Sequence, residues 1–284
     1  MPRWAPEPPL PLPPGCVVHV PGCGEMFVRD SGGDGPPLLL LHGWMVSGDL
    51  NWYGTYGPLA AAGYRVLAVD HRGHGRGLRS PEPFSLSACA ADAAGLVAHL
   101  QIPPVLAVGY SMGGPIASLM ARNHPDWVSG LVLGATAMSW SGRRMRTFWR
   151  TMAALRLAMG LAPESFWRRG LQAGGFPESP ITTWTAAELS RGNSVDIAEA
   201  GRELGRYDSR AWIAGLDASG AVIVTTEDTA VPPPRQRALA AAMSAPEFPV
   251  RGDHMAVVTR AGEFNAQLLK ALDAVRDPRA AAAA

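Results

Sequence analysis

One short stretch constrains the fold of this chain more than any other: residues 105–114, which read Val-Leu-Ala-Val-Gly-Tyr-Ser-Met-Gly-Gly. An apolar run leads into a Gly-x-Ser-x-Gly turn, and a helix-compatible segment follows from Pro115 to Asn123. Gly109 and Gly113 leave room for the close backbone approach that so sharp a turn requires. The pattern therefore predicts a strand, a tight turn and a helix, with the hydroxyl of Ser111 exposed at the tip of the turn.

The rest of the chain carries the partners that such a serine needs. A serine hydroxyl is a weak nucleophile near neutral pH, so it requires a base that is itself oriented by an acid. A buried strand is predicted over residues 221–226, and its exit loop carries Asp228. A shorter strand-like piece at 246–250 is followed by His254. Because the carboxyl ends of parallel strands share one edge of a sheet, we expect Ser111 to meet both residues there.

Each of these residues could instead have a purely structural role. Ser111 could be an ordinary polar residue of the turn, and Asp228 could merely cap the helix that starts near Pro232. Glu227 is an alternative acid, whereas Asp253 is more typical of a turn, since neighbours in sequence rarely present both side chains toward one point. The other histidines fall elsewhere along the chain: His19, His42, His71, His74, His99 and His124.

By these residues the chain resembles the serine α/β-hydrolase superfamily, in its single-domain esterase-like branch with a helical cap. The resemblance extends from about Val17 to about Val275 and rests on residues 41–44 (LHGW), 70–75 (DHRGHG), 109–114, 228–232 and 252–254. It implies that Ser111 is the nucleophile, Asp228 the acid and His254 the base. It also implies an oxyanion hole formed by the backbone N–H groups of Trp44 and Met112. Support for the turn and the oxyanion loop is expected from His42, Gly43, Gly109, Gly113 and Gly114.

Short apolar runs alternate with helix-like segments along most of the chain. This alternation predicts an α/β fold with a mostly parallel, doubly wound sheet and helices on both faces. After an opening hairpin, strands are expected at 37–41, 65–69, 104–108 and 129–133, and helices near 53–62 and 86–100. The resemblance makes this the α/β-hydrolase fold, and the catalytic candidates then lie at the carboxyl ends of the strands.

Between about residues 138 and 210 only helical spacing remains, which predicts an inserted helical cap. The core is expected over 16–137 and 211–276, with a loose Pro-rich arm at 1–15 and a disordered tail at 277–284. A cap would cover the pocket over Ser111, so its large apolar residues are candidates for lining that pocket. Alternatively, each of these residues could only pack the cap against the core. These candidates are Trp140, Phe148, Trp149, Met152, Trp167 and Trp184.

The composition of the chain limits the kinds of partner and compartment that we expect for it. A formal net charge of +1 gives no general attraction to nucleic acid. Three scattered cysteines form no C-x-x-C pair, so we expect no metal and no cofactor, and they fit a reducing compartment. Neither an apolar run of about 20 residues nor the apolar core of a secretory signal is present in the sequence. A cytoplasmic protein without stable membrane insertion is therefore expected, and its oligomeric state is left open.

The sequence thus predicts a carboxylesterase-like serine hydrolase that cleaves a small or medium ester through an acyl-enzyme. The same triad also serves perhydrolysis (cofactor-free haloperoxidase activity), C–C bond hydrolysis and acyl transfer in the family. A serine at the turn argues against the haloalkane dehalogenase and epoxide hydrolase relatives, whose turns carry aspartate. A non-catalytic ligand-binding protein that keeps the hydrolase shell is the alternative from a different class.

Overall fold

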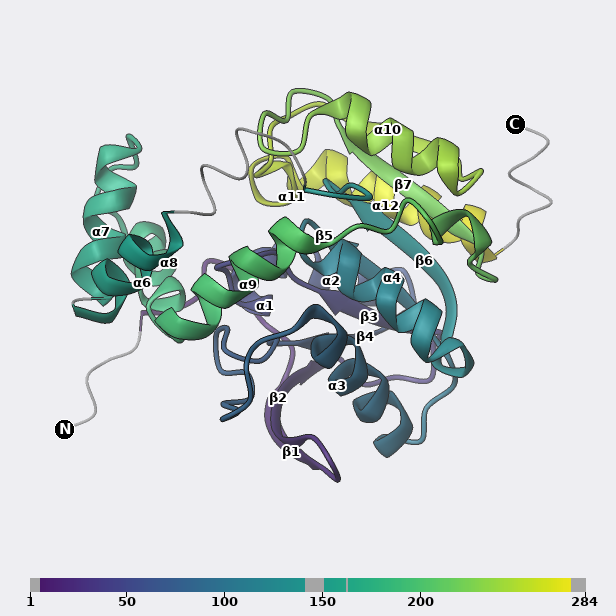
Figure 1. Cartoon of the computed structure of the whole chain (residues 1–284), viewed down its shortest axis with the longest axis horizontal. Coiled ribbons are helices and arrows are strands. Elements are labelled where there is room, and N and C mark those ends of the chain that lie inside the picture. Colours follow the sequence, from purple (N-terminus) through teal and green to yellow (C-terminus); the bar gives the residue numbers. More distant parts are fainter. Residues whose placement is uncertain (1–5, 141–150, 162, 277–284) are drawn as a thin grey trace.

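The computed structural model describes residues 6–140, 151–161 and 163–276, which fold around one eight-stranded sheet (Figure 1). The strands, in their order across the sheet, are β1 (Gly15–Val20), β2 (Gly24–Asp30), β4 (Arg65–Val69), β3 (Pro37–Leu41), β5 (Val105–Tyr110), β6 (Val128–Gly134), β7 (Gly220–Thr225) and β8 (Glu247–Val250). The pairs β1–β2 and β2–β4 are antiparallel, and all the other pairs are parallel. The predicted fold class, a mostly parallel sheet preceded by a hairpin, is confirmed.

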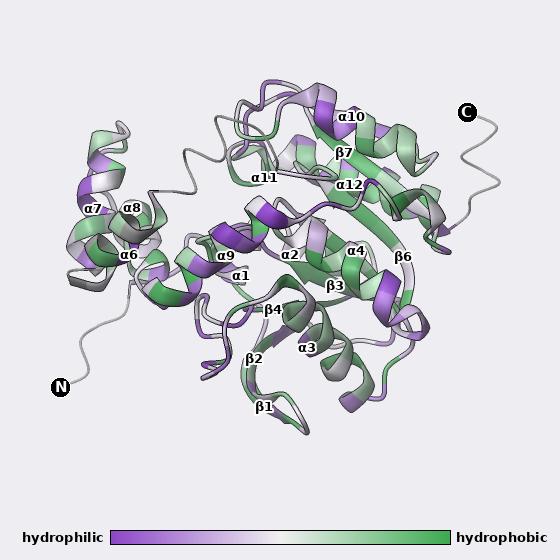
Figure 2. Cartoon of the chain, viewed as in Figure 1, coloured by the Kyte–Doolittle hydropathy of each residue, from purple (hydrophilic) through white to green (hydrophobic). Residues whose placement is uncertain are grey.

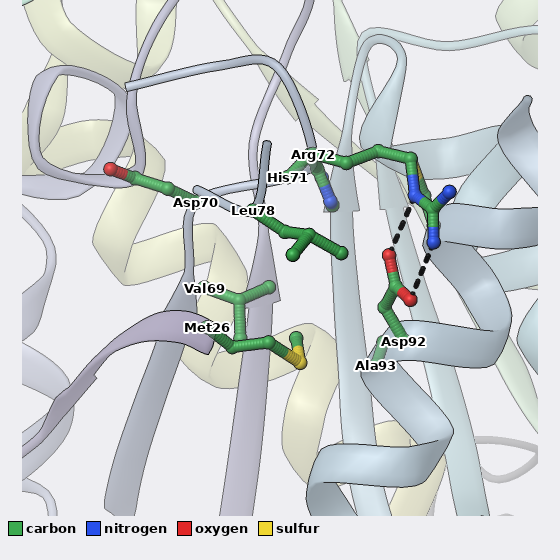
Figure 3. Close-up of a pocket in the computed structure, with 9 residues that line it drawn as sticks. Met26, Val69, Asp70, His71, Arg72, Leu78, Asp92 and Ala93 are labelled. Carbon is green, nitrogen blue, oxygen red and sulfur yellow. Dashed lines mark hydrogen bonds and ion pairs between the residues drawn. The ribbon is translucent and has the colours of Figure 1, made fainter. Parts of the chain in front are cut away.

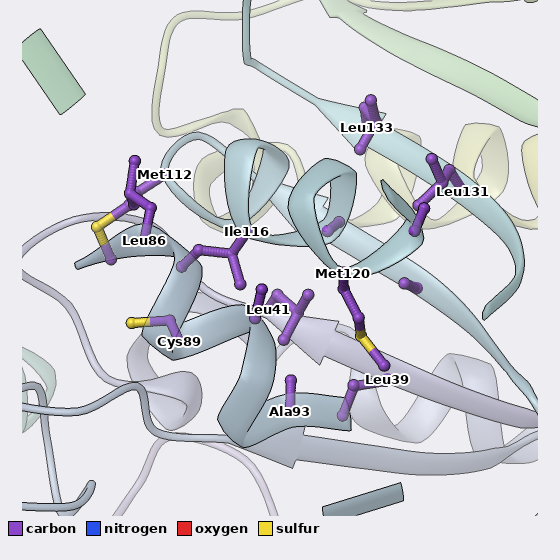
Figure 4. Packing of buried hydrophobic residues seen from close by; sticks show 14 of the residues in the cluster. Leu39, Leu41, Leu86, Cys89, Ala93, Met112, Ile116, Met120, Leu131 and Leu133 are labelled. Carbon is purple, nitrogen blue, oxygen red and sulfur yellow. The ribbon is translucent and has the colours of Figure 1, made fainter. Parts of the chain in front are cut away.

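The central strands are buried on both faces, which is why they read as continuous apolar runs rather than as alternating patterns. Residues 38–41 of β3 and all six residues of β5 are buried. Two hydrophobic clusters cover the two faces of the sheet. In one of them, Ile116 and Met120 of α4 lie beside Leu41 and Leu39 of β3 (Figure 4). Figure 2 shows the same apolar character along the strands at the centre of the molecule.

Helices cover both faces of the sheet, as expected for a doubly wound fold. Residues of α3 (Leu86–His99), α4 (Gly113–Asn123) and α10 (Pro233–Ala242) belong to one cluster. Residues of α1 (Gly48–Trp52), α2 (Tyr56–Ala61), α11 (Ala256–Thr259) and α12 (Ala261–Arg276) belong to the other. Two single 3₁₀ turns, η1 (Pro125–Trp127) and η2 (Ile213–Gly215), complete the core.

The helix expected near 53–62 is instead two short helices. Ser47 caps α1 by accepting a hydrogen bond from the Leu50 N–H at 3.1 Å, so the first helix starts before the expected segment. The Thr55 N–H then donates to the Trp52 carbonyl at 2.8 Å and closes a turn between the two helices. The apolar spacing of this region did not reveal the break, because residues on both sides of the turn are buried in the same cluster.

A helical insert separates β6 from β7, as predicted. It contains α6 (Met152–Leu161), α7 (Pro163–Ala173), α8 (Pro180–Leu189) and α9 (Ser194–Arg206). Ser139 and Asp208 form an isolated β-bridge, and the Ser209 N–H donates to the Met138 carbonyl at 2.8 Å. The insert therefore leaves and re-enters the core at one place, and α9 runs back across the core while α6–α8 lie at its side (Figure 1).

The segments expected at the two ends of the chain, a loose arm and a disordered tail, have different outcomes. The Pro-rich arm, expected to be loose, is attached at its end, because the Pro13 and Pro14 carbonyls accept hydrogen bonds from Arg29 and from the Asp30 N–H. The tail expected at 277–284 lies outside the described residues. Among the helices of the described part, none is both long enough and apolar enough to cross a membrane.

Candidate active site

Ser111 occupies a strained turn between β5 and α4. Its φ of +53° lies in the left-handed region, which costs a non-glycine residue about 1–3 kcal/mol unless its surroundings fix it. Two hydrogen bonds do so: the Ser111 N–H donates to the Gly134 carbonyl at 2.9 Å, and the Thr136 hydroxyl donates to the Ser111 carbonyl at 2.9 Å. The strained backbone at the tip of a strand is what exposes the hydroxyl.

The glycines of the turn are required by close packing. A Cβ on Gly109 would lie 2.3 Å from the Gly113 carbonyl oxygen, and one on Gly113 would lie 2.0 Å from the Leu41 carbonyl oxygen. A Cβ on Gly114 would lie 2.4 Å from the Thr136 hydroxyl oxygen, the group that holds Ser111. Each glycine therefore allows a contact that shapes the turn.

The structure brings the three predicted side chains together. The Ser111 Oγ lies 2.9 Å from His254 Nε2, and His254 Nδ1 lies 2.7 Å from Asp228 Oδ2. Ser111 and His254 are 143 positions apart in the sequence and meet because their strands end at the same edge of the sheet. Asp228 is 2% exposed, whereas the imidazole of His254 keeps about a quarter of its surface accessible. A substrate can thus approach the serine and the imidazole but not the carboxylate.

Several donors fix the orientation of the Asp228 carboxylate. Oδ1 accepts hydrogen bonds from the Ala230 and Val231 N–H groups at 2.8 Å, and Oδ2 accepts the Thr225 hydroxyl at 2.9 Å. Gln236 donates to the Thr225 hydroxyl at 2.8 Å and so supports this arrangement from α10. Thr225 and Gln236 were not predicted as site residues; the only local signal is that Thr225 ends the strand before Asp228.

A tyrosine holds the backbone of His254. The Tyr110 hydroxyl donates to the His254 carbonyl at 3.0 Å, and the two rings are tilted with centroids 5.9 Å apart. Burial raises the pKa of Tyr110, so its phenol remains a hydrogen-bond donor. Since Tyr110 directly precedes Ser111, one turn positions both the serine and the histidine loop.

The competing residues lie apart from this cluster. Glu227 is exposed and pairs with Arg251, at 3.0 Å. Asp253 is exposed and accepts a hydrogen bond from the Met255 N–H at 2.9 Å, which is the behaviour of a turn residue. His19 pairs with Glu25 on the opening hairpin. The geometry therefore favours Asp228 and His254 over their neighbours.

The loop after β3 passes directly beside Ser111. A Cβ on Gly43 would lie 3.4 Å from the Ser111 Cβ, and the Gly43 N–H donates to the Asn51 side-chain oxygen at 3.0 Å. Trp44 directly follows Gly43 in this loop. Met112 directly follows Ser111 as the N-cap of α4, at the end of the helix where N–H groups have no acceptor within the helix.

Three buried histidines support this loop from behind. His42 donates from Nδ1 to the Gly43 carbonyl at 2.8 Å, and its Nε2 accepts the His71 N–H at 2.9 Å. The His42 ring centroid lies 4.2 Å from that of His71 and 5.5 Å from that of His74. Burial lowers the pKa of His71 to about 3 and that of His74 to about 4, and it also lowers the pKa of His42. All three rings are therefore neutral near pH 7.

The segment that follows β4 is fixed by its own charged residues. Asp70 accepts the Gly48 and Arg76 N–H groups at 2.6 and 2.7 Å, and burial raises its pKa to about 6. Arg72 forms a bidentate ion pair with Asp92 of α3, in which Nε and Nη2 donate to the two carboxylate oxygens at 2.8 and 2.7 Å. The pair lies beside a small pocket (Figure 3). These contacts anchor the loop to its neighbours rather than turning its charges toward Ser111.

The cap candidates mostly pack against other residues. Trp140 is buried with its ring 6.1 Å from that of Tyr207, and Met152 is buried as well. Trp184 is buried against Leu50 of α1, and Trp167 packs at the edge of the same cluster. Phe148 and Trp149 lie outside the described residues. Whether any of these residues also lines a substrate pocket remains a prediction.

Comparison with known proteins agrees with this fold. The model of the alpha/beta hydrolase fold family matches residues 36–190. A non-heme haloperoxidase from Rhodococcus erythropolis is 41% identical over 110 residues, which are 38% of this chain and 39% of that protein. The matches span about a third to two fifths of the length of such curated relatives, which also include esterases and epoxide hydrolases.

Solved structures extend the likeness to nearly the whole chain. A hydrolase from Pseudomonas aeruginosa PA01 superimposes with a TM-score of 0.78 at 22% identity and covers 91% of this chain and 98% of its own. An esterase from Exiguobacterium antarcticum gives a TM-score of 0.75 at 21% identity, with coverages of 90% and 98%. At these identities the likeness is one of fold.

Proposed function

This chain belongs to the alpha/beta hydrolase fold family, and on that premise we propose that it is a serine hydrolase that cleaves a small or medium carboxylic ester. One observation carries the proposal: Ser111, His254 and Asp228 form a continuous line with separations of 2.9 and 2.7 Å. A nucleophile, a base and an orienting acid within hydrogen-bond reach are what acyl transfer through a serine requires.

In the first half of the reaction, His254 Nε2 accepts the proton of Ser111 as the hydroxyl oxygen attacks the ester carbonyl carbon. The electron pair of the carbonyl moves onto its oxygen, and Asp228 stabilises the imidazolium through Nδ1. The imidazolium then gives its proton to the leaving alcohol as the carbon–oxygen bond breaks. The acyl group remains on Ser111.

In the second half, His254 accepts a proton from water, and the hydroxide formed attacks the acyl carbon. The tetrahedral intermediate collapses, the proton returns to the Ser111 oxygen, and the carboxylic acid leaves. In both halves the N–H groups of Trp44 and Met112 are the donors that we assign to the oxyanion. A donor aimed at a developing oxyanion contributes about 3 kcal/mol to lowering the barrier.

The test is hydrolysis of p-nitrophenyl esters from acetate to palmitate by the wild type and by Ser111→Ala. We expect the wild type to be active and the variant to lose about 10⁴-fold or more in kcat. Ser118→Ala is the matched control, because Ser118 is a buried serine of the following helix, α4, and its hydroxyl donates to the Gly114 carbonyl at 2.9 Å. Equal inertness of wild type and Ser111→Ala would refute simple ester hydrolysis.

Perhydrolysis is a second candidate, favoured by the relatives that are named non-heme haloperoxidases. In this reaction hydrogen peroxide replaces water in the attack on the acyl-enzyme, and the peracid released oxidises a halide. Halide oxidation that needs both peroxide and a carboxylic acid, and that disappears in Ser111→Ala, would support it. Halide oxidation that persists in the variant would contradict it.

A further inference from the structure

The loop between β3 and α1 is held by the cap as well as by the core. We propose that cap helices α8 and α9 set the position of the Trp44 backbone N–H, and thereby the strength of the oxyanion hole. This inference rests on the proposed function, because it concerns the donor assigned to the oxyanion. In this view Glu188 of the cap and the side chain of Trp44 are positioning residues.

The core holds the two ends of this loop by hydrogen bonds to its backbone N–H groups. At its start, the Gly43 N–H donates to the side chain of Asn51 at 3.0 Å. At its end, the Gly48 N–H donates to the Asp70 carboxylate at 2.6 Å. Between these ends, Trp44 packs against a hydrophobic cluster of the core, and other contacts add to the position of the loop.

Those other contacts come from the cap. The indole Nε1 of Trp44 donates to the Ile197 carbonyl of α9 at 2.7 Å, across 153 positions of sequence. The Ser47 hydroxyl donates to the Glu188 carboxylate of α8 at 2.8 Å, across 141 positions. The two bonds flank the middle of the loop, one on each side of Met45.

Met45 is the reason that these contacts matter. Its φ of +69° lies in the left-handed region, which residues other than glycine rarely adopt. Such a conformation persists only where the surrounding structure over-determines it. The cap supplies one hydrogen bond on each side of this strained residue, so loss of either bond lets the backbone relax and turns the neighbouring Trp44 N–H.

Glu188 is a firm anchor on the cap side. Its carboxylate is buried and accepts hydrogen bonds from Arg76 at 2.7 and 3.0 Å and from Arg191 at 2.9 Å. Burial by itself would raise the pKa of Glu188, but the charge of Arg76 and these hydrogen bonds hold it below its ordinary value. The ionised carboxylate therefore links α8, the loop after β4 and Ser47 near neutral pH.

A cap that positions the oxyanion donor affects the transition state more than substrate binding. The oxyanion exists only after the serine attacks, so a displaced donor lowers kcat and leaves KM nearly unchanged. A displacement of about 1 Å can cost about 100-fold in rate. A cap that served only to bind the acyl or alcohol group would instead change KM.

The main test is Trp44→Phe, which keeps an aromatic ring and the backbone N–H but removes the bond to Ile197. We expect kcat for p-nitrophenyl butyrate to fall about 10- to 100-fold, with KM within about threefold of the wild type. Affinity for an alkylboronic acid, which forms a tetrahedral adduct on the serine, should fall with kcat. Affinity for the product butyrate should not change. Trp127→Phe, in the turn after α4, is the control for loss of an indole.

The second test is Glu188→Gln, with Glu178→Gln as its matched control, because Glu178 forms an exposed ion pair with Arg168 on the same cap. Glu188→Gln should also lower kcat selectively. Thermal unfolding of each variant identifies any loss that comes from unfolding. If both cap contacts act through the same loop, Trp44→Phe and Glu188→Gln combined should lose less than the product of their separate effects.

The outcomes are separable. An active wild type whose folded Trp44→Phe and Glu188→Gln variants keep their kcat, or change only KM, overturns this inference and leaves the proposed function standing. A wild type that hydrolyses no ester and does not form a boronate adduct at Ser111 overturns the proposed function and this inference with it. A selective loss of kcat and boronate affinity in both variants supports it.

Discussion

The buried histidines behind the oxyanion loop should make this fold sensitive to mild acid. Folded His71 and His74 bind a proton only near pH 3 and 4, because burial penalises their charged forms, whereas an ordinary histidine titrates near 6.5. Between these values the unfolded chain binds protons that the folded chain does not. Since protons then favour the unfolded state, the free energy of unfolding must fall as the pH falls below about 7.

The size of the effect follows from the pKa values. At pH 5, each of these two histidines costs about 2 kcal/mol relative to pH 7.5, or about 4 kcal/mol together. Asp70 acts in the opposite direction, because its raised pKa of about 6 lets the folded state take up a proton and regain about 1 kcal/mol. The net loss of about 3 kcal/mol is a large share of the stability of a typical domain, about 5–15 kcal/mol.

Urea unfolding followed by tryptophan fluorescence at pH 7.5, 6.5, 5.5 and 5.0 measures this loss. The midpoint should move to lower urea with an unchanged slope. In His71→Phe, which removes one titrating ring, the loss between pH 7.5 and 5.0 should shrink by about 2 kcal/mol whatever the stability of the variant at pH 7.5. A stability that stays flat down to pH 5, or a pH dependence unaltered in His71→Phe, would refute the reasoning.

Two further predictions concern the turn and the acid. Gly109→Ala should destabilise the protein by more than about 3 kcal/mol in thermal or urea unfolding, because its Cβ would lie 2.3 Å from the Gly113 carbonyl oxygen. Gly57→Ala in α2, where a Cβ meets no atom within 4 Å, should be neutral or slightly stabilising. Asp228→Asn should lower kcat about 10⁴-fold while the fold is retained, since an amide favours the wrong tautomer of His254. A loss under 10-fold in Asp228→Asn would refute the assignment of Asp228 as the acid.

The strands were largely readable from local sequence. The structure places β3 and β4 at the bounds expected for them, because each is an apolar run that ends at a polar residue or a loop. β5 extends two residues beyond its expected end, to Tyr110, so that the strand reaches the turn itself. The break between α1 and α2 was not predicted from the sequence. Buried side chains on both sides of the turn give the same apolar pattern as one continuous helical face.

The sequence by itself determined the parallel sheet and the order in which Ser111, Asp228 and His254 follow their strands. Apolar runs, glycines in tight turns and strand-exit loops are local features, and parallel strands bring their carboxyl ends to one edge whatever the rest of the chain does. Only the tertiary structure decided which groups hold these residues in place. Tyr110 contacts the backbone of His254 across 144 positions of sequence, and Glu188 contacts Ser47 across 141 positions. These contacts arise because elements that are distant in the sequence pack together, so no periodic pattern in the sequence reveals them.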